Sequence, residues 1–277
     1  MQARRFHLPS GLRPCVMGVL NVTPDSFSDG GTLRSSRRAV QRALQMAEEG
    51  AAVIDIGGES TRPGARPVAL EEELRRVLPI IERLAKRVRL PLSVDTSKAE
   101  VARRALEAGA LLVNDVTALR GDPEMADVVR EARASVVLMH MQGTPRTMQR
   151  APRYRHVVSD VRRWLSQAIR GAEARGIRRE QILIDPGIGF GKTVEQNLQL
   201  MRHVDRLTTL GPPVVLGPSR KSFIGKITGA DVPADRLGGT LACVSAAAAG
   251  RVAMVRVHDV KPAVQFLRMS EAMAHAR

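Results

Sequence analysis

The chain has 277 residues and a hydrophobic fraction of 44%, which supports one sizeable core and excludes global disorder. No apolar run approaches the ~20 residues that span a bilayer, and residues 1–14 lack the apolar centre of a secretory signal. We therefore expect a cytoplasmic protein in which Cys15 and Cys243 are buried free thiols rather than a disulfide.

The net charge of +15 raises the question of a nucleic-acid partner. The arginine pairs, however, fall on the polar sides of separate expected helices, and an aromatic content of 3% leaves few platforms for stacking bases. The charge is typical of a solvated exterior that also attracts anionic substrates. We expect no specific nucleic-acid partner and no membrane.

Short, apolar, β-branched runs recur along the chain, and each ends at a polar residue. Helix-like segments separate nearly all of them. This alternation predicts parallel strands, and eight such units are what a closed (β/α)8 TIM barrel of the α/β class needs. We expect a single domain over residues 1–277, with residues 1–14 as a short lead-in to the barrel. The polar residues at the expected strand ends are Asn21, Asp55, Asp95, Asn114, His140, Asp185, Ser219 and Arg256.

The expected helices follow from apolar residues at helical spacing and from start and stop signals. Four ranges are 38–49, 70–88, 157–169 and 235–250. Ser97 with Glu100, and Thr193 with Gln196, have the capping-box pattern that opens two more helices. Another begins near residues 122–123, where a proline follows a capping aspartate, and Asp259 is expected to cap the last helix.

Three connections are long and rich in glycine and proline: residues 21–34, 57–68 and 141–153. Long structureless connections inside a compact domain are usually functional or disordered. All three follow expected strands. In a barrel they lie on the rim where catalytic residues gather, so the functional interpretation is favoured.

The segment 185–193 resembles a phosphate-binding P-loop but has three residues, not four, between Gly187 and the Gly-Lys pair. The informative residue there is Asp185, because a carboxylate that ends an apolar strand must be paired, hydrated or used. His140 precedes a turn, and we interpret it as a structural histidine.

The segment 219–222 places three donor-bearing side chains and a cation at an expected strand end. Lys221 stands where a nucleophile elbow needs glycine, which disfavours a serine hydrolase. Arg256 and His258 are two residues apart, so in a strand they point the same way and suit an anion near the last strands. The alternative for these two is an ion pair with Asp259.

Asp55 and Asp95 are also consistent with caps or turns. No histidine, cysteine or carboxylate cluster has the spacing of a zinc site, so a metal cage built by protein alone is not expected.

Together these segments resemble the dihydropteroate synthase family over residues 16–260. The family joins 6-hydroxymethyl-7,8-dihydropterin diphosphate to 4-aminobenzoate, giving 7,8-dihydropteroate and diphosphate in folate synthesis, and it is the target of sulfonamides. The matching segments are 17–31, 55–64, 93–96, 114–116, 138–143, 185–193, 219–222 and 256–258.

The resemblance implies a role for particular residues. For the pterin it implies Asp95, Asn114, Met139, Asp185, Phe190, Gly217 and Lys221. For the diphosphate it implies Thr61, Arg62, Arg256 and His258. For 4-aminobenzoate it implies Thr61, Pro63, Phe190, Lys221 and Ser222. Asn21 is the implied side-chain ligand of Mg²⁺, and catalysis is expected from Asp95, Lys221 and Asp55.

The expected mechanism is dissociative: diphosphate leaves first, the carboxylates stabilise the cationic pterin methylene, and the aniline nitrogen then attacks. The resemblance also implies a homodimer, with the apolar C-terminal helices as the contact surface. Two alternatives stay open, a methyltetrahydrofolate–corrinoid methyltransferase and a non-catalytic pterin-binding paralogue.

Overall fold

The computed structural model describes residues 5–11, 13–22 and 32–276, with side chains omitted for residues 32–35. In this part of the chain eight parallel strands form one sheet in the order β6-β5-β4-β3-β2-β1-β8-β7. A bridge between Ile184 and Val214 joins the two ends of that order, which makes the sheet a nearly closed barrel. The strands are β1 Cys15–Asn21, β2 Val53–Gly57, β3 Leu92–Asp95, β4 Leu112–Asp115, β5 Ser135–Met139, β6 Ile182–Asp185, β7 Val215–Leu216 and β8 Met254–Val257.

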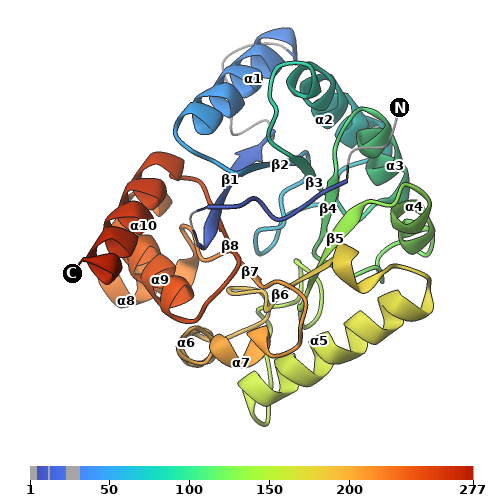
Figure 1. The fold of residues 1–277 in the computed structure, drawn as a ribbon. Helices are drawn as coiled ribbons and strands as arrows, with labels where there is room; N and C mark the ends of the chain where they lie inside the picture. The colour runs from blue at the N-terminus through green and yellow to red at the C-terminus, as the bar shows by residue number, and fades with distance from the viewer. Residues whose placement is uncertain (1–4, 12, 23–31, 277) are drawn as a thin grey trace.

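A ring of helices surrounds the strands, as the view along the barrel shows (Figure 1), and the expectation of a TIM barrel is confirmed. The main helices are α1 Thr32–Glu48, α2 Leu70–Ala85, α3 Ala99–Glu107, α4 Met125–Glu131, α5 Val157–Ala174, α6 Val194–Arg202, α9 Leu237–Ala249 and α10 Val260–His275. Shorter helices are α7 Asp205–Thr208 and α8 Ser222–Thr228, with 3₁₀ turns at Arg179–Gln181 and Pro233–Arg236. No helix in the described ranges is long and apolar enough to cross a membrane.

The helix caps differ from the sequence prediction in physically simple ways. The Ser97 capping box does not form: α3 begins at Ala99, and the Asp122 carboxylate accepts from the Ala99 N–H at 2.8 Å. Asp259 occupies the cap position of α10, but its side chain pairs with Arg220 instead of capping. An aspartate near a stronger cationic partner satisfies that charge before a backbone amide.

Several helix boundaries also differ from the expected ones. The helix expected over 70–88 ends at Ala85, that expected over 157–169 continues to Ala174, and that expected to begin near 122–123 begins at Met125. The first helix begins at Thr32, six residues before the expected start at 38, and the helix expected over 235–250 begins at Leu237 after a 3₁₀ turn. The expected connection 21–34 lies mainly outside the described residues, whereas 57–68 and 141–153 are connections without long helices or strands.

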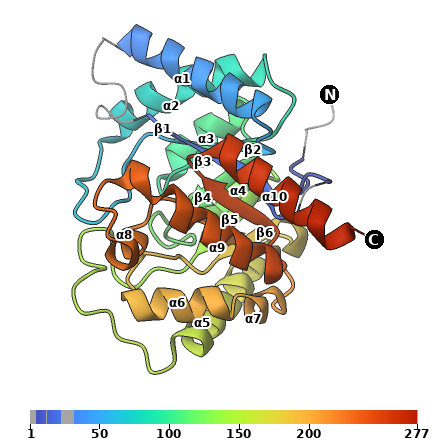
Figure 2. The same cartoon turned by 90° about the vertical axis from the view of Figure 1, so that its left-hand side faces the viewer.

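The strands alternate with period two between the helical shell and the barrel interior. The interior cluster contains one apolar residue from most strands, such as Val53 of β2 and Leu183 of β6, and Phe6 of the lead-in packs against it. Figure 1 shows this lead-in crossing the barrel on its way to β1, and Figure 2 shows the same barrel from the side. One end of the interior is therefore filled with apolar side chains.

The capping interactions give a direct test. Thr193 accepts from the Gln196 N–H at 3.2 Å and the Gln196 side chain accepts from the Thr193 N–H at 2.9 Å, as the sequence predicts. We expect Thr193→Ala to lower the free energy of unfolding by about 1 kcal/mol in urea titrations, because a helix-end amide loses its partner. The matched control Ser97→Ala is expected to change it by less than about 0.5 kcal/mol. Equal losses in the two variants would contradict the cap assignment.

Candidate active site

The carboxyl ends of the strands meet at the open end of the barrel, and the polar residues named from the sequence lie there. Asp55, Asn114, Asp185 and Arg256 each stand two residues after a member of the interior apolar cluster, so they face the same interior one layer higher. Asp95 ends β3, the strand between those of Asp55 and Asn114. The arrangement is a polar cup above an apolar floor.

The centre of this cup is the guanidinium of Arg256. Its Nε donates to Asp55 Oδ2 at 2.6 Å and one terminal nitrogen donates to Asp95 Oδ2 at 2.7 Å. Asn114 Nδ2 donates to the same Asp55 oxygen at 3.0 Å. Strands β2, β3, β4 and β8 are thereby joined by charged and amide side chains that are far apart in sequence.

The charge balance of this group is unequal, because two buried carboxylates share one guanidinium. Burial raises the pKa of Asp95 to about 7, an effect that Arg256 opposes and Asp55 strengthens. Burial alone would lower the pKa of Arg256, but Asp55 and Asp95 raise it above its ordinary value. Asp55 Oδ1 is buried without a hydrogen-bond partner among the described residues. The cup therefore holds an anionic excess that a cationic species would relieve.

Asp185 ends β6 on the opposite side of the cup. Its Oδ1 accepts from the Gly187 N–H at 2.6 Å, and burial raises its pKa although that hydrogen bond and Lys221 oppose the shift. Gly217 lies between Asp185 and Arg256: a Cβ there would be 4.0 Å from Asp185 Oδ2 and 3.9 Å from the Arg256 Cβ. Asp185 and Arg256 therefore border the same space.

Lys221 follows β7 and reaches the same space. Its Nζ lies 3.9 Å from the centre of the Phe190 ring, a cation–π contact. Burial lowers its pKa to about 8, Arg256 acts in the same direction, and Asp185 and Asp95 oppose the shift. The ring of Phe190 belongs to a small apolar cluster at the mouth, which also contains Val116, Met139, Met141 and Met148. The cup has one flat apolar wall beside its charged groups.

The outer rim comes from the connection after β2 and the start of α8. Thr61 is half-buried, Arg62 and Pro63 are exposed, and the positive charge of Arg62 contributes to the lowered pKa of Lys221. Ser222 is exposed at the first position of α8. These residues surround the opening rather than the centre of the cup.

His258 follows β8 and forms a pair that the sequence did not predict. Its Nδ1 lies 3.0 Å from Ser219 Oγ, which also accepts from the His258 N–H at 3.2 Å. Burial, followed by the charges of Arg256 and Arg220, lowers the pKa of His258 to about 3, so the ring is neutral. Asn21 Nδ2 is 3.5 Å from His258 Nε2. The sequence does contain a signal for this pair, because Ser219 and His258 follow two strands that are adjacent in the barrel.

Two interpretations from the sequence can be settled for this site. The ion pair of Arg256 with Asp259 is wrong: Arg256 pairs with Asp55 and Asp95, and Arg220 donates to Asp259 at 2.6 and 3.0 Å. The structural interpretation of His140 is supported, because its buried ring contacts Lys192 Nζ at 3.0 Å.

Both cysteines are free; Cys15 is buried, while Cys243 is only partly so.

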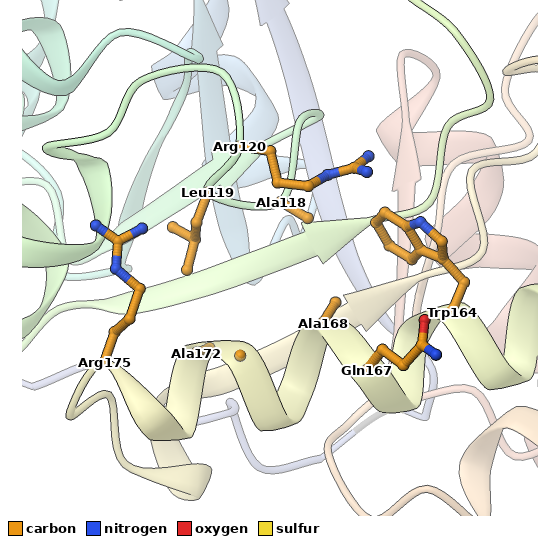
Figure 3. A pocket seen from close by; sticks show the side chains of 9 residues that line it. Ala118, Leu119, Arg120, Trp164, Gln167, Ala168, Ala172 and Arg175 are labelled. Carbon is orange, nitrogen blue, oxygen red and sulfur yellow. The ribbon is translucent and has the colours of Figure 1, made fainter.

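A cavity of about 290 Å³ lies apart from the cup, between the connection that follows β4 and helix α5. Figure 3 shows Arg120 extending toward the Trp164 ring, with Ala168 and Ala172 along the floor. The guanidinium carbon of Arg120 is 4.6 Å from the ring centre. None of the residues of the cup lines this cavity, so it is not the site that the strand ends build.

The comparisons with known proteins agree with this geometry. The family model of pterin-binding enzymes matches residues 17–258. A dihydropteroate synthase of Synechocystis is 47% identical over 95% of this chain and 91% of its own length. The solved dihydropteroate synthase of Xanthomonas albilineans with 4-aminobenzoic acid is 51% identical, with a TM-score of 0.90 over 96% of this chain and 94% of that one. Its complex with 7,8-dihydropteroate has a TM-score of 0.86, at 48% identity over 96% and 95% of the two chains.

The chain therefore belongs to the family of pterin-binding enzymes, built on a TIM barrel. Within that family it belongs to the dihydropteroate synthases, which are transferases of folate biosynthesis.

The shared guanidinium predicts a large and pH-dependent effect of its removal. Arg256→Met leaves Asp55 and Asp95 buried without a cation, and we expect a loss of about 3–5 kcal/mol in the free energy of unfolding at pH 8. A carboxyl whose pKa is raised on folding loses stability as pH rises from its unfolded to its folded pKa. The loss is therefore expected to be smaller at pH 5.5, below the raised pKa of Asp95, where that carboxyl holds its proton.

Urea titrations at the two pH values measure this difference. The control Arg103→Met removes partly exposed pairs with Glu100, Glu124 and Glu131 and is expected to cost less than about 1 kcal/mol at either pH. A loss in the Arg256 variant that does not change with pH would contradict the proposed charge balance.

Proposed function

We propose that the cup is where this chain condenses 6-hydroxymethyl-7,8-dihydropterin diphosphate with 4-aminobenzoate. The observation that carries the proposal is the convergence of Asn114, Asp185 and Lys221 around one space next to the apolar wall of Met139 and Phe190. A flat, polar-edged heterocycle needs such a combination of hydrogen-bonding groups on one side and an apolar surface on the other.

The polar edge of the pterin is assigned to Asp185 and Asn114. Asp185 keeps Oδ2 for the adjacent N–H donors of the ring, because only Oδ1 accepts from Gly187. The side-chain N–H of Asn114 donates to Asp55, which leaves the side-chain oxygen Oδ1 of Asn114 as an acceptor for the same edge of the pterin. Lys221 donates to the pterin carbonyl or a ring nitrogen, and Gly217 leaves room for the ring beside Asp185.

The chemical step is proposed to be dissociative. The bond between the pterin methylene and the diphosphate oxygen breaks, and the electron pair leaves with the diphosphate. The cationic methylene lies near Asp95, with Asp55 behind it, and their anionic excess stabilises the positive charge. The aniline nitrogen then forms the new C–N bond and releases a proton. Closure of residues 57–68 would exclude water, which otherwise captures the cation.

The diphosphate is assigned to the rim near β1 and β8. The second terminal nitrogen of Arg256 has no hydrogen bond to a described residue, and Arg62 adds a second positive charge. Thr61 and the neutral ring of His258 add hydrogen-bonding groups. As the anion approaches, its charge would raise the pKa of His258 and favour a second donor there.

Mg²⁺ fits this assignment through a single protein ligand. Among the residues that the structure describes, no group of three histidine, cysteine or carboxylate side chains could hold a metal. The amide of Asn21 is half-buried beside His258 and supplies the hard oxygen that Mg²⁺ prefers, with diphosphate oxygens and water completing the shell. When bound, the ion would neutralise charge on the departing diphosphate.

The 4-aminobenzoate is assigned to the outer rim, between Thr61, Pro63, Phe190, Lys221 and Ser222. Sulfonamides have a similar shape and would compete there. We also propose a homodimer in the cytoplasm, in which a second copy covers the exposed apolar side chains on and near the last helices, Ile227, Val232, Met269 and Met273.

The direct assay is diphosphate release from purified protein with both substrates, with and without Mg²⁺. Release that requires 4-aminobenzoate and yields dihydropteroate supports the proposal. Methyl transfer to a corrinoid, or pterin binding without turnover, would instead favour one of the two alternatives from the sequence.

The pterin assignment predicts that Asp185→Ala abolishes binding of 6-hydroxymethylpterin in calorimetric titrations, since the ring loses its charged acceptor. The control Asp205→Ala changes a carboxylate at the start of α7, outside the cup, and is expected to bind the pterin as the unaltered chain does. Normal turnover by the Asp185 variant would refute the placement of the ring.

The role of Asp95 predicts a pH profile. Only the ionised carboxylate stabilises the cation, and its pKa in the free protein is about 7. We expect kcat/KM for the pterin diphosphate to rise with pH through about 7 and then to level off. Asp95→Asn should lower kcat roughly 100-fold and remove this rise. A profile in the variant with the same inflection would assign the titration to another group.

A further inference from the structure

The glycine-rich segment 185–193 contains a buried lysine that the proposed reaction does not use. Lys192 is 3% exposed, and its ammonium lies 2.8 Å from the carbonyl oxygens of Gly187 and Phe190. It also lies 3.0 Å from His140 Nδ1 and 3.4 Å from the His140 carbonyl oxygen. One cation therefore joins the residue after β5 to two points of the turn after β6.

The turn that Lys192 holds carries the pterin subsite. It begins at Asp185, and Phe190 is one of its members. Gly187 has a φ of +67° and its backbone packs so closely that a Cβ would collide with the His140 carbonyl oxygen. The His140 N–H donates to the Asp185 carbonyl at 2.9 Å, so the two strand ends are in register. A shift of this turn would move both the carboxylate and the apolar wall.

Among the described residues, the ammonium is held by neutral acceptors, and no carboxylate is in hydrogen-bond contact with it. Its three N–H donors match three close acceptors, the two carbonyl oxygens of the turn and His140 Nδ1. Burial lowers the pKa of Lys192 to about 7; the charge of Asp185 opposes this and that of Lys221 strengthens it. The carbonyl oxygens of the turn hold the Lys192 ammonium in place, and the ammonium in return holds these two points of the turn together.

His140 is a neutral partner for this lysine. Burial and the charge of Lys192 lower its pKa to about 2. Its ring is fixed from the other side by Trp164, edge-on with a centroid distance of 4.9 Å and an interplanar angle of 85°. A neutral ring accepts at Nδ1 and does not repel the ammonium, which explains why a histidine and a lysine are adjacent in the interior.

We propose that Lys192 is a positioning residue for the pterin: its ammonium fixes the turn from Asp185 to Phe190 against the end of β5, and so sets the distance between the carboxylate and the apolar wall. This inference rests on the proposed function of the cup. Lys192 touches neither substrate in it; the lysine acts through Asp185 and Phe190.

The test replaces Lys192 by methionine, which has a similar length and no charge. Removing the ammonium leaves the Phe190 carbonyl oxygen without its donor, and the Gly187 carbonyl oxygen keeps only the Phe190 N–H at 3.0 Å, so the turn relaxes. We expect the dissociation constant for 6-hydroxymethylpterin, measured by calorimetry, to rise at least about tenfold. KM for the pterin diphosphate should rise by a larger factor than kcat falls, because the variant misplaces the groups that bind the ring but keeps the catalytic carboxylates.

The matched control is Gln181→Met, which lies in the 3₁₀ turn just before β6, whereas Lys192 lies in the turn that follows β6. Gln181 is buried, donates to the Ala134 carbonyl at 2.6 Å and lies on the face of the barrel away from the cup. It is expected to lose stability without a change in pterin affinity. Should Lys192→Met fail to fold, His140→Leu removes the Nδ1 acceptor, together with the ring contacts to Trp164 and Tyr154, and keeps the two carbonyl acceptors of the turn. A smaller rise in the pterin dissociation constant is then expected.

The outcomes separate the two claims. If the unaltered chain does not bind the pterin, the proposed function is wrong and the inference with it. If the unaltered chain binds it, and both Lys192→Met and His140→Leu lower stability as Gln181→Met does while pterin affinity and KM stay the same, Lys192 is merely structural and the proposal is overturned.

Discussion

The site depends on one guanidinium shared between two buried carboxylates. Arg256 holds Asp55 at 2.6 Å and Asp95 at 2.7 Å, which ties the ends of β2 and β3 to β8 inside the barrel mouth. One positive charge cannot neutralise both partners, so the pair retains anionic character where the proposed reaction develops a cation. Such an arrangement is unfavourable in the absence of a ligand, and the surrounding barrel must hold it in place.

That support comes from the period-two alternation of the strands. The interior layer below the cup is apolar and is packed by Phe6 from the lead-in, whereas the layer above it carries Asp55, Asn114, Asp185 and Arg256. The larger apolar cluster between strands and helices holds the barrel from outside. Stability and chemistry are thus assigned to successive layers of the same strands, which is how barrels support sites on rigid elements.

Positively charged side chains hold the connections of the mouth through two kinds of acceptor, backbone carbonyls and carboxylates. Lys192 binds backbone carbonyls, and Arg236 likewise donates to the carbonyls of Ala230, Asp231 and Arg220. Lys98 instead lies between the carboxylates of Glu59 and buried Glu73, and Glu59 accepts from the Val68 N–H. Several cations of this basic chain therefore fix loops internally, and the net charge need not be read as a nucleic-acid surface.

The sequence by itself determined the barrel, the strand ends and most residues of the cup. Short apolar runs that end in polar residues and alternate with helical segments have few other solutions, and parallel strands bring their carboxyl ends to one rim. The Thr193 capping box was likewise readable, because its two hydrogen bonds are local. What only the tertiary structure decided are the partners: that Arg256 chooses Asp55 and Asp95 while Arg220 takes Asp259, and that Asp122 rather than Ser97 caps α3. The acceptors of the buried Lys192 ammonium, two carbonyl oxygens and His140 Nδ1, were likewise decided only by the tertiary structure. Each is a choice among chemically equivalent groups, and distance after folding, not residue type, makes that choice.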